Sequence, residues 1–89
     1  MLKYTEDTCY VYVLGAAGAD YYRTYVGWTT NLLRRLDEHN SGNGARFTRG
    51  RNWKLLYAER HSNRKIAMSR EWQIKQNRKF RKQLVNNQK

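Results

Sequence analysis

Apolar and aromatic residues occur in short runs along the chain, and the spacing within each run predicts its secondary structure. Residues 10–14 and 21–28 are rich in aromatic and β-branched side chains, which favours two β-strands. The glycine- and alanine-rich residues 15–20 predict a turn, so the two strands should form a hairpin. Residues 32–39 place leucines at helical spacing behind the capping oxygens of residues 29–31, which predicts a helix.

The second half of the chain predicts one more strand and two more helices. Residues 53–59 carry apolar and aromatic side chains and are expected to form the third strand. Ser62 or Asn63 can cap a helix that covers residues 64–76. A final helix is expected over residues 77–86.

The order β-β-α-β-α-α predicts an α+β fold, in which helices flank a small, mostly antiparallel three-stranded sheet. Proline is absent, and no linker or repeat interrupts the 89 residues. We therefore expect one domain over residues 1–89, with its motif-bearing core at about residues 10–76.

Charge points to the class of partner. Eighteen Lys and Arg residues face seven Asp and Glu residues, which gives a net charge of +11. Such a domain attracts polyanions, nucleic acid before anionic membrane, although a merely soluble basic surface is the plainer alternative. The chain has no apolar run of about 20 residues and no apolar N-terminal signal. With Cys9 as the single cysteine, a cytoplasmic location and no membrane association are expected.

Glu71 stands out because of its surroundings in the sequence. It is the only acid between Arg60 and Lys89, a segment that holds ten Lys and Arg residues. On a helix it shares a face with Ala67 and Ile74, so its carboxylate is drawn toward the core or a cleft edge. A carboxylate there needs either a metal ion or a salt bridge to an arginine, and the sequence alone leaves both open.

Arg35 and His39 lie four residues apart and share one face of the first predicted helix. An arginine at a cleft edge suits bidentate contact with a phosphate. The alternatives are an ordinary interface arginine and a helix-end histidine whose protonated form the helix dipole favours. Asp37 and Glu38 are expected on the outer side of the same helix, so the chain lacks the converging carboxylates of a two-metal site.

Four elements in chain order resemble the GIY-YIG nuclease superfamily. Its members include the nuclease domain of the excision-repair protein UvrC and intron-homing endonucleases, and the closest likeness is to small stand-alone bacterial members. Residues 38–42 and 46–51 extend that likeness, which covers about residues 10–75. The elements are Tyr10-Val11-Tyr12, Tyr25-Val26-Gly27, Asn31 through Arg35 to His39, and Glu71.

The resemblance implies a role for each matching residue. Tyr12 would be the general base, and Tyr25 would place the water or the scissile phosphate. Arg35 would stabilise the phosphate, and His39 fills a position taken by His or Tyr. Glu71 would be the sole protein ligand of one Mg²⁺ or Mn²⁺ ion.

Two departures from the family pattern stand in the sequence. Tyr10 and Val11 replace the glycine and isoleucine of the first motif, which removes no reactive group. Many members also carry an active-site asparagine after the metal-binding glutamate. The candidates here are Asn77, Asn86 and Asn87, and the sequence assigns none of them.

The sequence thus predicts a metal-dependent endonuclease that hydrolyses DNA, structure-selective or non-specific, with a role in repair or recombination. The alternative is a non-catalytic basic module that binds nucleic acid, while a basic structural protein of a ribonucleoprotein particle would leave Glu71 unexplained. The choice between DNA and RNA, a protein partner for targeting, and monomer or homodimer stay open. The predicted nucleic-acid contacts are Arg46, Arg49, Arg51, Lys75 and Arg78.

Overall fold

The structure, a computed structural model, describes residues 8–18 and 22–88. The predicted order of strands and helices is confirmed, with one short 3₁₀ helix added. The elements are β1 (Cys9–Ala17), β2 (Tyr22–Thr29), α1 (Leu32–Ser41), η1 (Arg46–Thr48), β3 (Lys54–His61), α2 (Arg64–Gln76) and α3 (Arg78–Asn86).

The sheet is antiparallel throughout, with β1 between its two neighbours. The strand order is β2-β1-β3, and residue Tyr12 at the centre pairs with Gly27 on one side and Ala58 on the other. The pairing of β1 with β3 shifts between Val13 and Leu14. The predicted α+β class with a three-stranded antiparallel sheet is therefore confirmed.

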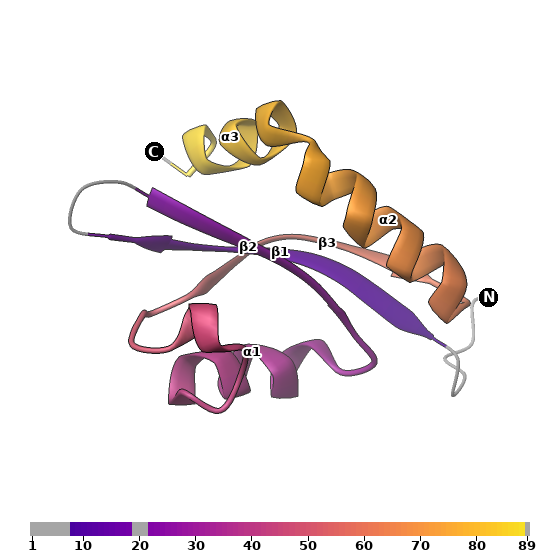
Figure 1. The fold of residues 1–89 in the computed structure, drawn as a ribbon, viewed down its shortest axis with the longest axis horizontal. Coiled ribbons are helices and arrows are strands. Elements are labelled where there is room, and N and C mark those ends of the chain that lie inside the picture. Colours follow the sequence, from indigo (N-terminus) through magenta and orange to yellow (C-terminus); the bar gives the residue numbers. More distant parts are fainter. Residues whose placement is uncertain (1–7, 19–21, 89) are drawn as a thin grey trace.

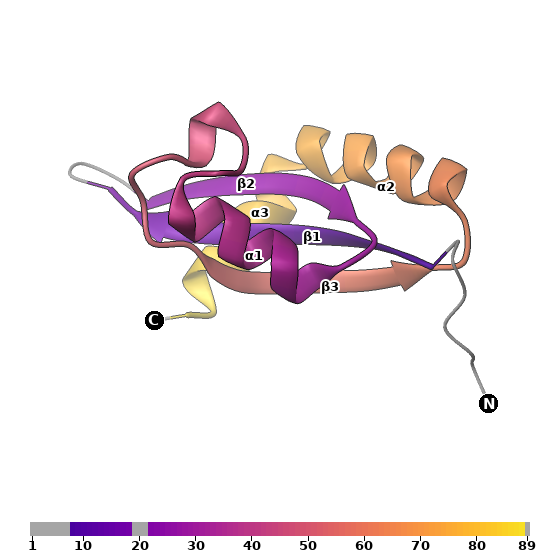
Figure 2. The ribbon, with the colours of Figure 1, turned by 90° about the horizontal axis from the view of Figure 1, so that it is seen from below.

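Helices cover both faces of this sheet. Helix α1 and η1 lie on one face, and α2 and α3 lie on the other (Figures 1 and 2). Because side chains alternate along a strand, β1 supplies both cores. Val11 and Val13 pack with Ala67 of α2, whereas Tyr12 and Leu14 point toward α1.

The hairpin is longer than the sequence pattern indicates. Residues 15–17 were expected in the turn, but β1 continues through Ala17, which pairs with Tyr22. A Cβ on Gly15 would lie 2.5 Å from the Tyr22 ring, so this glycine serves close packing inside the sheet and makes no turn. Residues 19 and 20 of the predicted turn, and Tyr21, the first predicted residue of the second strand, lie outside the described residues.

Three asparagines cap the helices: Asn31 and Asn63 are among the predicted capping residues, and Asn77 stands where the last helix was expected to begin. The side chains of Asn31, Asn63 and Asn77 each accept a hydrogen bond from the backbone N–H three residues on, at 3.0–3.1 Å. Helix α1 ends at Gly42, whose φ of 86° suits glycine. Across the described part of the chain, no helix has the length and apolarity needed to cross a membrane.

Candidate active site

Four of the five predicted catalytic residues meet on the α1 face of the sheet. Tyr12 comes from β1 and Tyr25 from β2, while Arg35 and His39 come from α1. The ring centroids of Tyr25 and His39 lie 4.9 Å apart, and those of Tyr12 and His39 lie 5.9 Å apart. The structure thus brings together residues that are up to 27 positions apart in sequence.

A chain of buried hydrogen bonds runs through this cluster. The Thr48 hydroxyl donates to the carbonyl of Ala45 at 2.7 Å, so its only proton is already used. His39 Nδ1, 2.8 Å from Thr48 Oγ1, must therefore be the donor in that contact. Neutral His39 then has a lone pair on Nε2, which accepts the proton of the Tyr12 hydroxyl at 2.9 Å. The order of donors is thus Tyr12 to His39 to Thr48 to Ala45.

Trp53 and Asn40 hold the loop that carries Thr48. Trp53 donates its indole N–H to the Thr48 carbonyl at 2.8 Å. The Asn40 side chain accepts from the backbone N–H of Trp53 at 2.6 Å and donates to its carbonyl at 3.0 Å. These three bonds tie the end of α1 to the residue before β3, so Thr48 is fixed beside His39.

Two glycines leave room for the same side chains. A Cβ on Gly27 would lie 2.5 Å from the Tyr12 hydroxyl oxygen, and a Cβ on Gly44 would lie 2.6 Å from His39 Nδ1. Both distances are shorter than real Cβ contacts. Glycine at these positions is therefore required by the packing of Tyr12 and His39.

Burial sets the protonation states in this cluster. Burial raises the pKa of Tyr12 to about 12, although a side-chain hydrogen bond with Arg35 works in the opposite direction. Burial and the charge of Arg35 lower the pKa of His39 below its ordinary value of 6.5. At neutral pH the pair is therefore a protonated tyrosine that donates to a neutral histidine. The alternative of a protonated helix-end histidine is wrong, because burial and the charge of Arg35 favour the neutral form.

Glu71 lies on α2, beyond the sheet from α1, and its charge still reaches the cluster. Its carboxylate contributes to raising the pKa of Tyr12. The side chain is 20% exposed and forms an ion pair with Lys75 of the same helix at 2.9 Å. The predicted alternative of a buried salt bridge to an arginine is therefore not what the structure has.

Glu71 offers one carboxylate, so a Mg²⁺ or Mn²⁺ ion held there would keep most of its water. Within residues 8–18 and 22–88 no three His, Cys, Asp or Glu side chains gather as a metal cage. Mg²⁺ usually binds one or two carboxylates and completes its shell with water and substrate phosphate. Asn77 caps α3 through its side-chain oxygen, so this candidate asparagine is already engaged.

A groove of about 280 Å³ opens beside Arg35 at the start of α1. Arg34, Arg35 and Arg64 line it, so it presents three guanidinium groups to a ligand. Glu38 lines it as well and pairs with Arg35 at 3.2 Å. The expectation that Glu38 lies on the outer side of α1 is wrong for this reason, whereas Asp37 is exposed.

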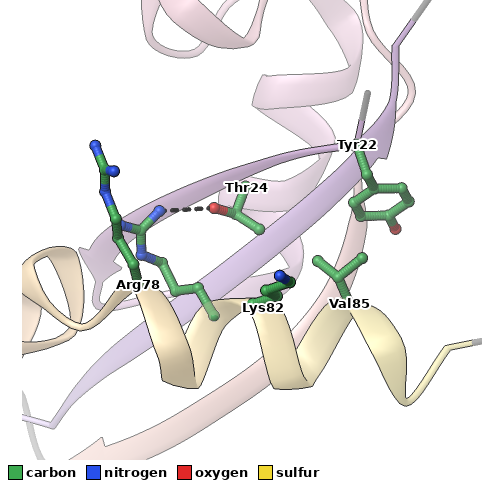
Figure 3. A pocket seen from close by; sticks show the side chains of 6 residues that line it. Tyr22, Thr24, Arg78, Lys82 and Val85 are labelled. Atoms are coloured by element: carbon green, nitrogen blue, oxygen red, sulfur yellow. Dashed lines mark hydrogen bonds between the residues drawn. The ribbon is translucent and has the colours of Figure 1, made fainter. Parts of the chain in front are cut away.

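The predicted nucleic-acid contacts fall in three places. Arg46 and Arg49 are exposed around η1, and the guanidinium of Arg51 lies over the ring of Phe47, beside Tyr25. Lys75 is paired with Glu71. Arg78 lines a pocket between β2 and α3 (Figure 3), on the sheet face opposite α1.

Sequence reasoning missed the residues that organise the site. Thr48, Trp53 and Gly44 were not selected, although residues 46–51 were noted as part of the family likeness. The usable signal was local, since a glycine and a tryptophan flank a basic stretch that contains a threonine. Their role depends on contacts across 5 to 9 residues of loop, which no periodicity reports.

Comparison with known proteins supports the assignment of the fold. The family model described as the GIY-YIG catalytic domain matches residues 8–84. A UPF0213 protein from Natronomonas pharaonis is 46% identical over 67 residues, covering 74% of this chain and 75% of the relative. One from Oceanobacillus iheyensis is 40% identical over 78 residues, covering 86% and 87%.

A solved structure also matches. The solution NMR structure of a UPF0213 protein from Bacillus halodurans shares 36% identity, covers 89% of this chain and 83% of its own, and has a TM-score of 0.49. The matched residues 8–84 contain all five predicted catalytic side chains. Because the family model covers residues 8–84, the chain belongs to the GIY-YIG nuclease family.

Proposed function

We propose that the protein is a metal-dependent endonuclease that hydrolyses phosphodiester bonds of DNA. The observation that carries this proposal is the buried hydrogen bond from the Tyr12 hydroxyl to neutral His39, with Arg35 beside it. A core tyrosine needs only one partner for its hydroxyl. A tyrosine that donates to an unprotonated imidazole can also pass its proton on.

The proton path resolves a difficulty with Tyr12 as a base. With a pKa raised to about 12 by burial, Tyr12 holds its proton at neutral pH and cannot accept another. It can accept the proton of an attacking water if its own proton moves to His39 Nε2 at the same time. Tyr12 then relays the proton, and His39 is the base that finally holds it. Thr48 keeps Nε2 free by accepting from Nδ1.

Three further groups would handle the phosphate. Arg35 would donate to its oxygens and stabilise the charge that builds up as the bond breaks. Tyr25 would place the phosphate against Tyr12. A Mg²⁺ or Mn²⁺ ion held by Glu71 and water would supply Lewis-acid stabilisation of the phosphate and the leaving oxygen.

The charge of the protein supports DNA as the substrate. The groove beside Arg35 carries three arginines, and η1 adds exposed arginines at the other end of the cluster. We expect these guanidinium groups to bind phosphates, and phosphate contacts carry no sequence information, which supports structure-selective or non-specific cleavage. Cleavage of this kind would serve DNA repair or recombination in the cytoplasm. A protein partner would supply any targeting.

The test is the nicking of supercoiled plasmid by wild-type protein, Glu71→Gln and Glu59→Gln, each with Mg²⁺, Mn²⁺ or EDTA. Glu59 is the matched control because it is also a paired glutamate, but its partner is Arg70 and its side chain lies on the sheet face opposite that of Tyr12. We expect metal-dependent nicking by the wild type and Glu59→Gln and none by Glu71→Gln. Equal nicking by all three proteins would refute the one-metal scheme. No nicking at all, with equal DNA binding, would favour the non-catalytic binding module.

A further inference from the structure

Phe47 is a large aromatic side chain that the fold leaves half exposed beside the catalytic cluster. It lies on η1, and 47% of it is accessible to solvent. Its ring is nearly parallel to that of Tyr25, at 23° with centroids 6.2 Å apart. It also contacts the ring of Trp53 at 6.1 Å. The fold therefore holds Phe47 in one orientation while part of its surface faces water.

Two arginines from different elements flank this ring. The guanidinium carbon of Arg23, on β2, lies 5.9 Å from the ring centroid, and that of Arg51, after η1, lies 6.0 Å from it. An aromatic surface between two cations matches the chemistry of a nucleotide, whose base stacks and whose phosphates are anionic. A simple cover for the core would bury its ring instead of leaving it open between charges.

We propose that Phe47, Arg23 and Arg51 form a platform for an unpaired nucleobase of the DNA strand that is cut. A base inside an intact duplex is stacked on both sides and cannot reach an aromatic ring on a protein surface. Because the platform adjoins Tyr25, the stacked base belongs to a nucleotide next to the phosphate in the site. The preferred substrate is thus single-stranded DNA or a duplex with a locally unpaired nucleotide. The position of the cut relies on the proposed nuclease function, whereas the binding preference does not.

The platform is tested by binding alone, in EDTA, so that no cleavage occurs. Fluorescence anisotropy would measure the affinity for a labelled single strand, its blunt duplex, and the same duplex with one unpaired nucleotide. The variants are Phe47→Leu, which keeps apolar bulk, and Phe47→Trp, which keeps a ring. Trp72→Leu is the matched control, because Trp72 is an aromatic residue of α2 that is 64% exposed. Circular dichroism confirms that each variant folds.

We expect Phe47→Leu to weaken binding of the single strand and of the duplex with the unpaired nucleotide by about tenfold. Its affinity for the blunt duplex should change less than about twofold, since that contact is electrostatic. Phe47→Trp and Trp72→Leu should bind all three like the wild type. Equal losses on all three probes, or no loss, would overturn the proposal. Loss of single-strand preference in Trp72→Leu would also overturn it. If the protein prefers the probes with an unpaired nucleotide but never nicks plasmid, the platform stands and the proposed nuclease function is rejected.

Discussion

The two faces of the sheet use the same central strand for different purposes. On the face toward α2 and α3, β1 contributes Val11 and Val13 to an apolar core with Ala67. On the face toward α1 it contributes Tyr12, which is equally buried but hydrogen-bonded to His39. One face is held by burial of apolar area, and the other by a chain of polar contacts inside an aromatic cage.

This difference explains where the protein can carry out chemistry. The buried side chains of Val11, Val13 and Ile74 in that core have no group to move a proton, and any polar change among them costs stability. The polar face is stable only because each buried group has a partner: Tyr12 has His39, and His39 has Thr48. Stability and reactivity therefore depend on neighbouring residues of a single strand.

The largest expected effect comes from changing those neighbours one at a time. Tyr12→Phe removes the hydroxyl that relays the proton, so the nicking rate should fall by about 10²- to 10⁴-fold. The free energy of unfolding should fall by only about 1 kcal/mol, because the ring stays. Val13→Ala should do the reverse: about 2 kcal/mol of stability is lost, while the folded protein cuts normally. Single-turnover nicking and urea unfolding measure the two quantities. If both variants lost activity and stability together, the two faces would not be separable.

A smaller effect should follow from changing which ring nitrogen of His39 carries the proton. Thr48→Val keeps the shape but cannot accept from Nδ1, so the tautomer with a free Nε2 loses its support. We expect the nicking rate to fall by about tenfold to 100-fold, and Thr48→Ser to restore most of it.

In the wild type the rate should fall as the pH drops below 6.5, because protonation at the lowered pKa of His39 occupies Nε2. A pH–rate profile that is flat from 8 to 5 would remove His39 from the proton path.

On the apolar face, the ion pair of Glu59 should make stability depend on pH. Hydrogen bonds from Arg70 above all lower the pKa of Glu59 to about 2 from 4.5, with Tyr57 and His61 as further partners. A lowered pKa stabilises the fold fully above pH 4.5, and this stabilisation disappears as the pH falls toward 2. Glu59→Gln should lose about 1–2 kcal/mol at pH 7, since Arg70 is partly exposed. Its difference from the wild type should shrink in urea unfolding at pH 3, and a constant difference would contradict this account.

The sequence predicted the parts of the molecule that depend on local pattern. The helix caps at Asn31 and Asn63, each one of the predicted alternatives, depend on a side chain and a backbone N–H three residues away, so local composition suffices. The order of the strands follows from aromatic and β-branched runs. The extension of β1 to Ala17 was not predicted from such a run, because alanine has weak strand propensity. Only the pairing with β2 holds Ala17 in the strand.

The site was predicted in part, for a related reason. Tyr12, Arg35 and His39 were found through motif spacing, and the structure does join them. Phe47 and Thr48 were missed because they lie in the segment between α1 and β3. The two hydrogen bonds between the Asn40 side chain and the Trp53 backbone set the shape of that segment. Contacts of that kind leave no period in the sequence.

The smallest expected effect concerns which face DNA touches. Each phosphate contact releases counterions, so removing one cation that binds phosphate lowers the slope of log affinity against log salt by about 1. Arg49→Gln, beside η1, should lower the slope in this way, whereas Arg78→Gln, in the pocket between β2 and α3, should leave it unchanged. Fluorescence anisotropy titrations at salt concentrations of about 50 to 300 mM would measure the slope for both variants. An equal decrease for Arg78→Gln would mean that DNA wraps around the edge of β2 and contacts both faces. The apolar face would then bind substrate as well as stabilise the fold, and the division between the faces would hold for chemistry alone.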